Sequence, residues 1–295
     1  MSTVRIAAAQ YPIDAIESFA AYAAKLTRWV EDAARQGAHM LVFPEYGAME
    51  LTRIAGADIA RDLHKSIAAL QEVLPEADAL QARLARQHGV FILGASAPVR
   101  GRDGRYRNVA RFHAPSGQSH AQEKLIMTRF EREIWRIDAG AGQAVFDTPH
   151  GRIGVAICYD VEFPLTVRAL THAGAEIILA PSCTDTAHGY WRVRVGAQAR
   201  ALENQCFALQ APTIGDAPWS PAVDANVGAA GAYAPPDVGL PANGVIVCGE
   251  MNAPGWVFAD LDLARIRAVR SGGQQLNHAH WSEQKAQPAA LIRLS

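Results

Sequence analysis

Short apolar runs alternate along the chain with longer segments in which apolar residues recur at helical spacing. The run at residues 5–10 predicts a strand, and the segment after it predicts an amphipathic helix that begins near Asp14 and ends at Gly37. Further apolar runs predict strands at residues 39–44, 90–95, 106–113, 151–158, 176–181, 206–211 and 256–261. Helical spacing predicts helices at residues 59–70, 77–87 and 190–203, and another after Pro164. Strands that alternate with helices in this way are typical of an α/β fold whose sheet is covered by helices.

Two segments far apart in the chain resemble each other. Residues 37–44, GAHMLVFP, and residues 174–181, GAEIILAP, each follow a predicted helix, begin with glycine and end with proline and then a polar residue. Glycine is common at any helix end, so part of this likeness is general. The match in character along eight positions favours duplication of a half-fold and predicts that the two strand ends lie side by side. We therefore expect one domain over residues 1–270, and a tail over 271–295 that could lie at a subunit contact.

Composition narrows the class of protein. About half of the 295 residues are hydrophobic (49%) and 19% are charged, which excludes an intrinsically disordered chain. The formal net charge is −1 and no block of Lys or Arg occurs, so there is no electrostatic case for binding nucleic acid or an anionic membrane. The sequence shows neither a signal peptide nor an apolar run of the ~18–20 residues that cross a bilayer. A cytoplasmic location is expected.

Four cysteines are spread along the second half of the chain: Cys158, Cys183, Cys206 and Cys248. They form no CxxC pair, so neither a zinc site nor a disulfide framework is indicated, and reduced thiols are expected. The simplest interpretation of each is a small buried hydrophobic residue.

Three residues with reactive or charged side chains lie beside apolar segments of the sequence. Glu45 and Cys158 each follow such a strand at its carboxyl end, where open α/β sheets place their sites, and Lys124 borders an apolar patch. Taken singly, they could be a loop acid, a core thiol and a surface lysine. Together, FPEY at residues 43–46, EKL at 123–125 and GVAICYD at 154–160 resemble the nitrilase superfamily of carbon–nitrogen hydrolases.

This resemblance runs from Val4 to Asp262, and RALEN at residues 200–204 also looks like a family helix. It implies a four-layer α-β-β-α sandwich, a homodimer or larger assembly joined through helices beyond the nucleophile strand, and no metal or other cofactor. It also implies that Cys158 attacks a small-molecule amide to form a thioester, with Glu45 as general base and acid. Lys124, together with the main-chain N–H of Tyr159, would stabilise the oxyanion.

Many family members carry a second glutamate after the lysine. Glu131 and Glu133 are the candidates here, and we favour Glu133 because a tryptophan follows it two positions later. Relatives that act on acidic amides often show arginine where this chain has Glu162, so we expect a neutral or cationic amide. Ser182 and Cys183 end the repeated strand and should also face the substrate.

Several alternatives remain at this stage. Amidase is favoured over nitrilase because the chain has Cys158-Tyr159-Asp160 where nitrilases usually show Cys-Trp-Glu. An N-carbamoyl amidase, a catalytically idle binding module and a thiol redox protein using Cys158 and Cys183 stay open. The pair His278 and His280 could hold a metal, but packing of the tail at a subunit contact explains it more simply.

Overall fold

The computed structural model describes residues 3–284 and 288–294. Its strands form one path in the order β4-β5-β3-β2-β1-β10-β9-β8-β7, which divides into two half-sheets. The first half-sheet contains β1 (Thr3–Pro12), β2 (Met40–Val42), β3 (Phe91–Leu93), β4 (Ala97–Arg100), β5 (Tyr106–His113), β6 (Ser119–Glu123) and β14 (Gly255–Asp262). The second contains β7 (Val145–Thr148), β8 (Gly151–Val155), β9 (Ile177–Ser182), β10 (Phe207–Asp216), β12 (Gly231–Tyr233) and β13 (Val245–Cys248), while β11 (Ala225–Asn226) pairs with the end of β10. Within the described residues, the strand pairing that joins the two half-sheets is that of Tyr11 and Pro12 of β1 with Thr213 and Ile214 of β10.

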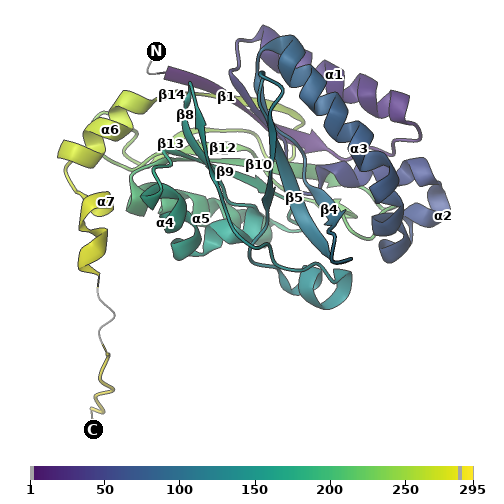
Figure 1. The fold of residues 1–295 in the computed structure, drawn as a ribbon. Coiled ribbons are helices and arrows are strands. Elements are labelled where there is room, and N and C mark those ends of the chain that lie inside the picture. Colours follow the sequence, from purple (N-terminus) through teal and green to yellow (C-terminus); the bar gives the residue numbers. More distant parts are fainter. Residues whose placement is uncertain (1–2, 285–287, 295) are drawn as a thin grey trace.

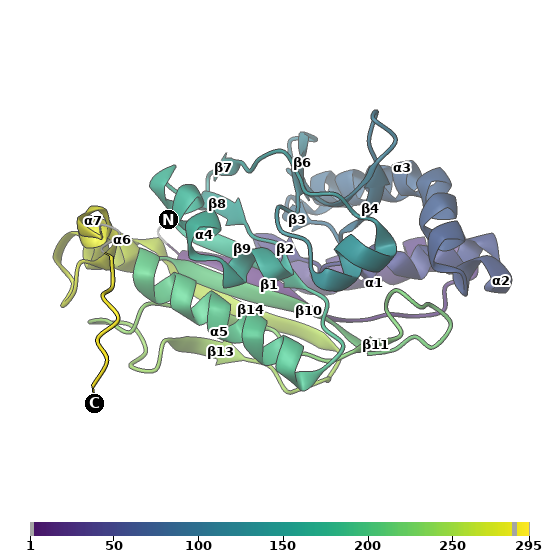
Figure 2. The same ribbon diagram turned by 90° about the horizontal axis from the view of Figure 1, so that it is seen from below.

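Helices cover the outer face of each half-sheet (Figure 1). On the first side lie α1 (Phe19–Arg35), α2 (Ala57–Ala60) and α3 (Leu63–His88), and on the second lie α4 (Pro164–His172) and α5 (Ala187–Asn204). Beyond β14 the chain continues into α6 (Leu263–Gly272) and α7 (Asn277–His280). Figure 2 gives the view at right angles to Figure 1, with α5 on the outer side of the second half-sheet.

Strand β1 shows how the layers are held together, because both of its faces are buried. Ile6 and Ala8 face the core shared with the second half-sheet, which includes Ile178 of β9. Ala7 and Tyr11 face the other core, beneath α1 and α3. Side chains alternate between the faces of a strand, so an apolar run without polar interruption is what such a central strand requires. The layer order is therefore helix, sheet, sheet, helix, as the sequence predicted.

Three of the predicted helices were wrong in their bounds. Helix α1 begins at Phe19, because the hydroxyl of Ser18 accepts the N–H of Ala21 as its N-cap. Asp14 instead pairs with Lys25 at 2.8 Å. The two helices predicted over residues 59–70 and 77–87 are mainly one, α3, which continues through Pro75 because its buried face is unbroken on both sides of the proline.

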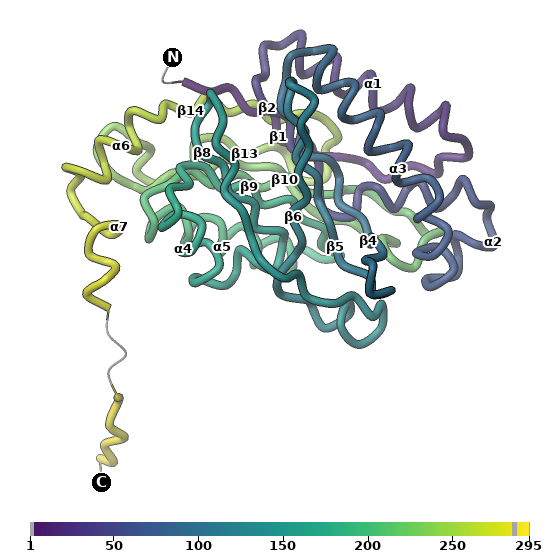
Figure 3. Tube along the Cα trace, in the orientation of Figure 1, coloured from purple at the N-terminus to yellow at the C-terminus, as the bar shows by residue number. Residues whose placement is uncertain are grey.

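The repeated segments occupy equivalent places in the two half-sheets. β2 lies between β1 and β3, and β9 lies between β10 and β8. Gly37 and Gly174, which precede them, both have positive φ (79° and 101°), the left-handed backbone in which glycine ends a helix. Their carboxyl ends point to the place where the half-sheets face each other, and the candidate site lies there. In Figure 3 the C-terminal segment 288–294 extends away from the domain, with Leu291 87% exposed.

Candidate active site

Three chain segments bring Glu45, Lys124 and Cys158 together. Glu45 follows β2, Lys124 follows β6, and Cys158 begins a 3₁₀ turn (Cys158–Glu162) after β8. Their side chains are buried, with 1%, 1% and 4% of the residue surface exposed. The Lys124 ammonium donates to Glu45 Oε1 at 2.8 Å. Burying a charged pair costs free energy unless further hydrogen bonds satisfy both groups. Such a pair therefore requires a closely defined set of neighbours.

The main chain of Cys183 connects Glu45 and Cys158. Its N–H donates to Glu45 Oε2 at 3.0 Å, and its carbonyl accepts the Cys158 thiol at a distance of 3.8 Å from Sγ. Cys183 lies directly after β9, so the ends of the two repeated segments meet at the carboxylate. The strand ends predicted to lie side by side therefore form one wall of the site.

The backbone at Cys158 is strained. Its φ is 49°, in the left-handed region that residues with a Cβ rarely adopt. Glycine would fit this turn more easily but would supply no thiol. Such strain is maintained only where the surroundings determine it, and it is concentrated at functional sites. The turn directs the thiol toward Glu45 and Cys183.

A buried network fixes the segment that follows Glu45. The 3₁₀ helix at Gly47–Ala55 carries Glu50, whose carboxylate accepts the Tyr11 hydroxyl at 2.6 Å and the Lys25 ammonium at 2.7 Å. Tyr46 has a φ of 53°, and its N–H donates to Ser96 Oγ at 2.9 Å. These contacts hold the chain on the far side of Glu45, as β2 does on the near side.

A second acid, Glu131, completes the cluster. Its Oε2 accepts the Lys124 ammonium at 2.6 Å, and its Oε1 accepts the Tyr46 hydroxyl at 2.6 Å. The N–H of Thr128 donates back to Glu131 Oε2 at 2.8 Å. Glu133 lies on the exposed side of the same π-helical turn (Glu131–Trp135) and pairs with Arg129. The preference for Glu133 as the acid that contacts the lysine was wrong, because this turn directs Glu131 inward and Glu133 outward.

Burial and neighbouring charges set the protonation states. Burial raises the pKa of Glu45 to about 7 against the opposing effect of Lys124. Burial, then the Glu45 charge, keeps the pKa of the Cys158 thiol well above its ordinary value. Burial also acts to raise the pKa of Glu131, but Lys124 and the hydrogen bonds it accepts outweigh this and lower it. Lys124 has a raised pKa, since its two carboxylates outweigh its burial. The resting site thus holds a neutral thiol beside a carboxylate that titrates near neutrality.

Asp160, on the same turn as the thiol, anchors the segment after Lys124. Its carboxylate accepts the main-chain N–H of Leu125 at 3.1 Å and of Ile126 at 2.7 Å. Burial raises its pKa to about 6, although these hydrogen bonds act to lower it. In the sequence Asp160 is only the last residue of the GVAICYD motif, whereas in the structure its carboxylate links the Cys158 turn to the segment after Lys124.

Of the other residues predicted to face the substrate, Tyr159, Glu162 and Cys183 are partly exposed and Ser182 is buried. Glu162 is half-buried and pairs with Arg192 of α5 at 3.5 Å, and the Tyr159 ring lies edge-on to Phe163. Cys183 is partly exposed, and its Sγ lies 3.3 Å from Asn226 Oδ1. Ser182 is fully buried, and its hydroxyl contacts Gln210 at 3.5 Å. The contact of Ser182 is therefore with β10 rather than with the catalytic cluster.

The tail histidines show no set of metal ligands. His278 and His280 lie in α7, and within residues 3–284 and 288–294 no three His, Cys, Asp or Glu side chains gather as metal ligands. Arg168 of α4 stacks on Trp281 and donates to the His278 carbonyl, so this segment packs against α4. No helix in the described part of the chain is both long and apolar enough to span a bilayer.

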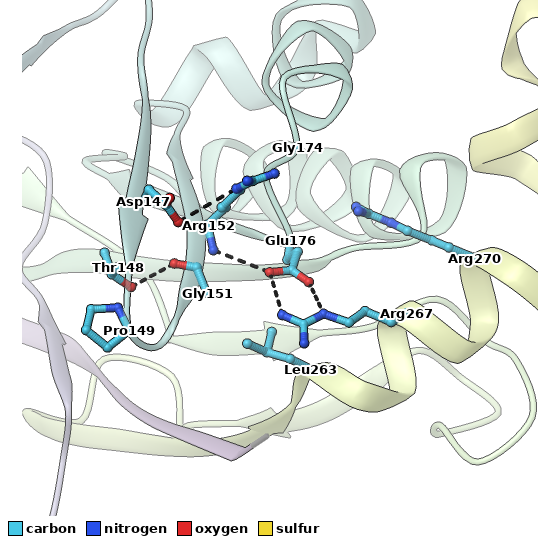
Figure 4. Close-up of a pocket in the computed structure, with 10 residues that line it drawn as sticks. All are labelled: Asp147, Thr148, Pro149, Gly151, Arg152, Gly174, Glu176, Leu263, Arg267 and Arg270. Carbon is cyan, nitrogen blue, oxygen red and sulfur yellow. Dashed lines mark hydrogen bonds and ion pairs between the residues drawn. The ribbon is translucent and has the colours of Figure 1, made fainter. Parts of the chain in front are cut away.

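A separate cavity of about 500 Å³ lies at the other end of β8 and β9 (Figure 4). It holds the ion pair of Arg267 with Glu176, at 2.6 Å, together with Arg152 and Arg270. None of the lining residues, all in the described part of the chain, is a predicted site residue. Because β8 and β9 run parallel, their opposite ends carry this cavity and the Cys158 cluster.

Comparison with known proteins agrees with this geometry. A model of the family "Carbon-nitrogen hydrolase" matches residues 5–271. The chain is 33% identical over 270 residues to the protein named "Probable hydrolase YhcX" of Bacillus subtilis, a match that covers 92% of this chain and 52% of that protein. It is 33% identical over 201 residues to the bifunctional nitrilase/nitrile hydratase NIT4A of Lupinus angustifolius, covering 63% of this chain and 55% of the relative. The chain belongs to the carbon–nitrogen hydrolase family, in the nitrilase superfamily.

The fold agrees with that membership. The crystal structure of Nit3 from Saccharomyces cerevisiae, described as a member of branch 10 of the nitrilase superfamily, superposes with a TM-score of 0.71 at 18% identity. That match covers 92% of this chain and 94% of the yeast chain. The four-layer fold inferred from the sequence is confirmed. The chain spans about half the length of the curated relatives named above.

Proposed function

We propose that this chain hydrolyses the carbon–nitrogen bond of a small-molecule amide through a thioester on Cys158. The observation that carries the proposal is the buried contact of Glu45, Lys124 and Glu131 beside the strained Cys158 turn. A thiol with a raised pKa needs a base at its side, and a carboxylate with a pKa of about 7 is suited to accept its proton near neutral pH.

In the first half-reaction the Cys158 sulfur attacks the amide carbon while Glu45 takes the thiol proton. The carbonyl oxygen becomes an oxyanion, which the Lys124 ammonium stabilises as a fixed charged donor. Glu45 then gives its proton to the leaving nitrogen. The C–N bond breaks, ammonia or an amine departs, and the acyl group remains on sulfur as a thioester.

In the second half-reaction Glu45 removes a proton from water as the water oxygen attacks the thioester carbon. The C–S bond breaks, the carboxylic acid leaves, and the proton held by Glu45 returns to the Cys158 sulfur. The roles of Glu131 and Lys124 stay the same in both halves: Glu131 holds the lysine, and the lysine holds the oxyanion. These steps need no group beyond this chain's own residues and water.

Glu162 supports a proposal for the charge of the substrate. This carboxylate lies four residues after the nucleophile and is half-buried, and the Lys124 charge acts to lower its pKa. Arg192 pairs with it at 3.5 Å and offsets part of its charge, so its effect on a cationic substrate is weaker than that of a free carboxylate. We therefore favour an uncharged amide, with anionic amides disfavoured because Arg192 is occupied.

Nitrile hydrolysis is the second candidate, and the lupin nitrilase/nitrile hydratase relative favours it. The same thiol would add to the nitrile carbon. An N-carbamoyl amide would use the same steps as a simple amide.

We also propose a homodimer in which α5 meets its copy. Trp191, Val195 and Leu202 lie along one face of α5 and are 49%, 59% and 45% exposed. Leu165 of α4 is also exposed (73%). Apolar side chains gathered on one surface indicate an interaction site. Light scattering should give twice the chain mass for wild type and one chain mass for Val195→Asp.

Ammonia release tests the main proposal. Purified wild type and Cys158→Ala are compared on uncharged, anionic and cationic amides, N-carbamoyl compounds and nitriles. Turnover of uncharged amides that Cys158→Ala abolishes is the expected result. Turnover only of nitriles would move the assignment to nitrilase. Absence of turnover, with equal ligand binding by both proteins, would favour the binding module.

A further inference from the structure

Asn108 lies at the centre of the catalytic cluster although no sequence motif drew attention to it. It is in β5 and fully buried. Its side-chain Nδ2 donates to Glu45 Oε1 at 2.9 Å and lies 3.4 Å from Glu131 Oε1. Its main-chain carbonyl accepts the N–H of Lys124 at 2.9 Å. One residue therefore contacts all three charged members of the cluster.

We propose that Asn108 is a positioning residue that reserves one oxygen of Glu45, Oε2, for proton exchange with Cys158. This inference rests on the proposed function, in which Glu45 accepts the thiol proton. It adds a residue that would not touch the substrate, and it gives a reason why one particular oxygen of Glu45 would accept the thiol proton.

The hydrogen bonds of Glu45 distinguish its two oxygens. Oε1 receives two donors, the Lys124 ammonium at 2.8 Å and the Asn108 amide at 2.9 Å, which occupy both of its lone pairs. Among the described residues, Oε2 accepts one such hydrogen bond, from the Cys183 N–H at 3.0 Å, which leaves a lone pair for the proton of the Cys158 thiol. Cys183 contacts Oε2 through its N–H and the Cys158 thiol through its carbonyl, and on this ground we assign the proton exchange to Oε2.

The orientation of the Asn108 amide follows from the same contacts. If the amide were turned over, its oxygen would face two carboxylate oxygens, so the donor nitrogen must face them. In this orientation Oδ1 is buried without a hydrogen-bond partner among the described residues. A buried acceptor left without a partner is unfavourable. The amide orientation therefore satisfies the two carboxylates and leaves its own oxygen without a hydrogen bond.

Loss of the amide should change the titration of Glu45 in a defined direction. A donor to a carboxylate stabilises its ionised form, so removing the donor raises the pKa. The other groups that face Glu45 are Lys124, Glu131, Cys158 and Cys183, with Tyr46 next to it. The Glu131 charge, which also acts to raise the pKa of Glu45, stays in place when the amide is removed.

The test measures alkylation of Cys158 by iodoacetamide between pH 5 and 9, so no substrate is needed. The rate is followed on the Cys158 peptide by mass spectrometry, in wild type, Asn108→Ala and Asn108→Asp. Asn204→Ala is the matched control: Asn204 is an equally buried asparagine, and its amide bonds Thr171 and Arg200 instead. We expect the wild-type rate to fall on the acid side of about pH 7, where Glu45 becomes protonated.

Asn108→Ala should shift the acid side of this pH profile, where the alkylation rate falls, upward by about one pH unit. At a given pH on that side, this is about a tenfold loss of rate. Asn108→Asp, which keeps the size and adds a negative charge, should shift the acid side at least as far. Asn204→Ala should leave it in place, whatever its effect on the melting temperature. If the folded Asn108 variants lose alkylation rate at the same pH as wild type, the inference is overturned. If Asn108→Ala does not fold, the result for Asn108→Asp decides.

Glu45→Gln separates this inference from the proposed function. If wild type and Glu45→Gln alkylate with the same pH profile, Glu45 is not the base and the proposed function fails. If the rate of Glu45→Gln no longer falls on the acid side while both Asn108 variants keep the wild-type profile, only the role of Asn108 fails.

Discussion

The Glu45 carboxylate accepts a hydrogen bond of 3.0 Å from the main-chain N–H of Cys183, a residue 138 positions later in the chain. This contact joins the ends of β2 and β9, the two repeated segments, across the space between the half-sheets. Main-chain donors hold a carboxylate without the rotational freedom of a side chain. The base of the proposed reaction is therefore fixed by the fold itself, and replacing the Cys183 side chain should leave this hydrogen bond in place.

Replacing Glu131 by glutamine should lower kcat by about 10²-fold, because the Lys124 ammonium loses one of its two buried carboxylates and its orientation. Glu133→Gln is the matched control, two residues away on the surface, and should keep wild-type kcat and stability within ~0.5 kcal/mol. Steady-state kinetics on the best amide found measure the difference. Equal losses in both variants, or a loss in Glu133→Gln alone, would contradict the assignment.

Activity should fall as the pH drops through about 7. Burial raises the pKa of Glu45 to about that value, and the protonated carboxyl cannot accept the thiol proton. The base is thus active above its pKa, and kcat/KM should decrease about tenfold per pH unit below it. A pH profile from 5 to 9 checks this. A flat profile over that range would show that no group with this pKa controls the reaction.

Asp160→Ala should reduce both activity and stability. The carboxylate receives the N–H groups of Leu125 and Ile126, so its loss leaves these donors unpaired and frees the segment that carries Lys124. We expect kcat to fall at least about tenfold and unfolding to become easier by roughly 1–3 kcal/mol. Denaturant unfolding and kinetics are measured together. Wild-type kcat at lowered stability would mean that Asp160 supports the fold but not the lysine.

The Glu162 and Arg192 pair should control the preference for substrate charge. Glu162→Gln frees Arg192 and should raise kcat/KM for anionic amides, whereas Arg192→Gln frees Glu162 and should favour cationic ones. Because Arg192 is largely exposed, each change should be about two- to fivefold. The double variant should return to the wild-type preference. A ratio of anionic to cationic turnover that stays constant across all four proteins would refute this.

The sequence allowed Glu45, Lys124 and Cys158 to be predicted for a physical reason. Two of them follow apolar strands, and the ends of such strands converge at the site. Glu131 was harder to predict as the acid that contacts Lys124, because the spacing of two glutamates on one turn does not show which of them faces inward. The signal that could have found it is the Thr-x-x-Glu spacing of residues 128–131, since the structure forms the reciprocal bonds of a capping box there.

Other features could not be predicted from local pattern. Asn108 contacts Glu45 across 63 positions, and a single asparagine in a strand gives no signal of such a partner. The apolar spacing predicts two helices, at residues 59–70 and 77–87, whereas α3 continues through Pro75, a residue type that usually ends or kinks a helix. Burial of residues on both sides of the proline, including Leu74 and Ala77, outweighs that local preference.

The most direct test of the central claim is to find the atom that carries the acyl group. Wild type, Cys158→Ala and Cys183→Ser are mixed with a turned-over amide, quenched in acid and analysed by peptide mass spectrometry. The proposal predicts an adduct of substrate mass minus ammonia on the Cys158 peptide in wild type and in Cys183→Ser, and neither adduct nor turnover in Cys158→Ala. An adduct on Cys183, or turnover that survives in Cys158→Ala, would contradict it.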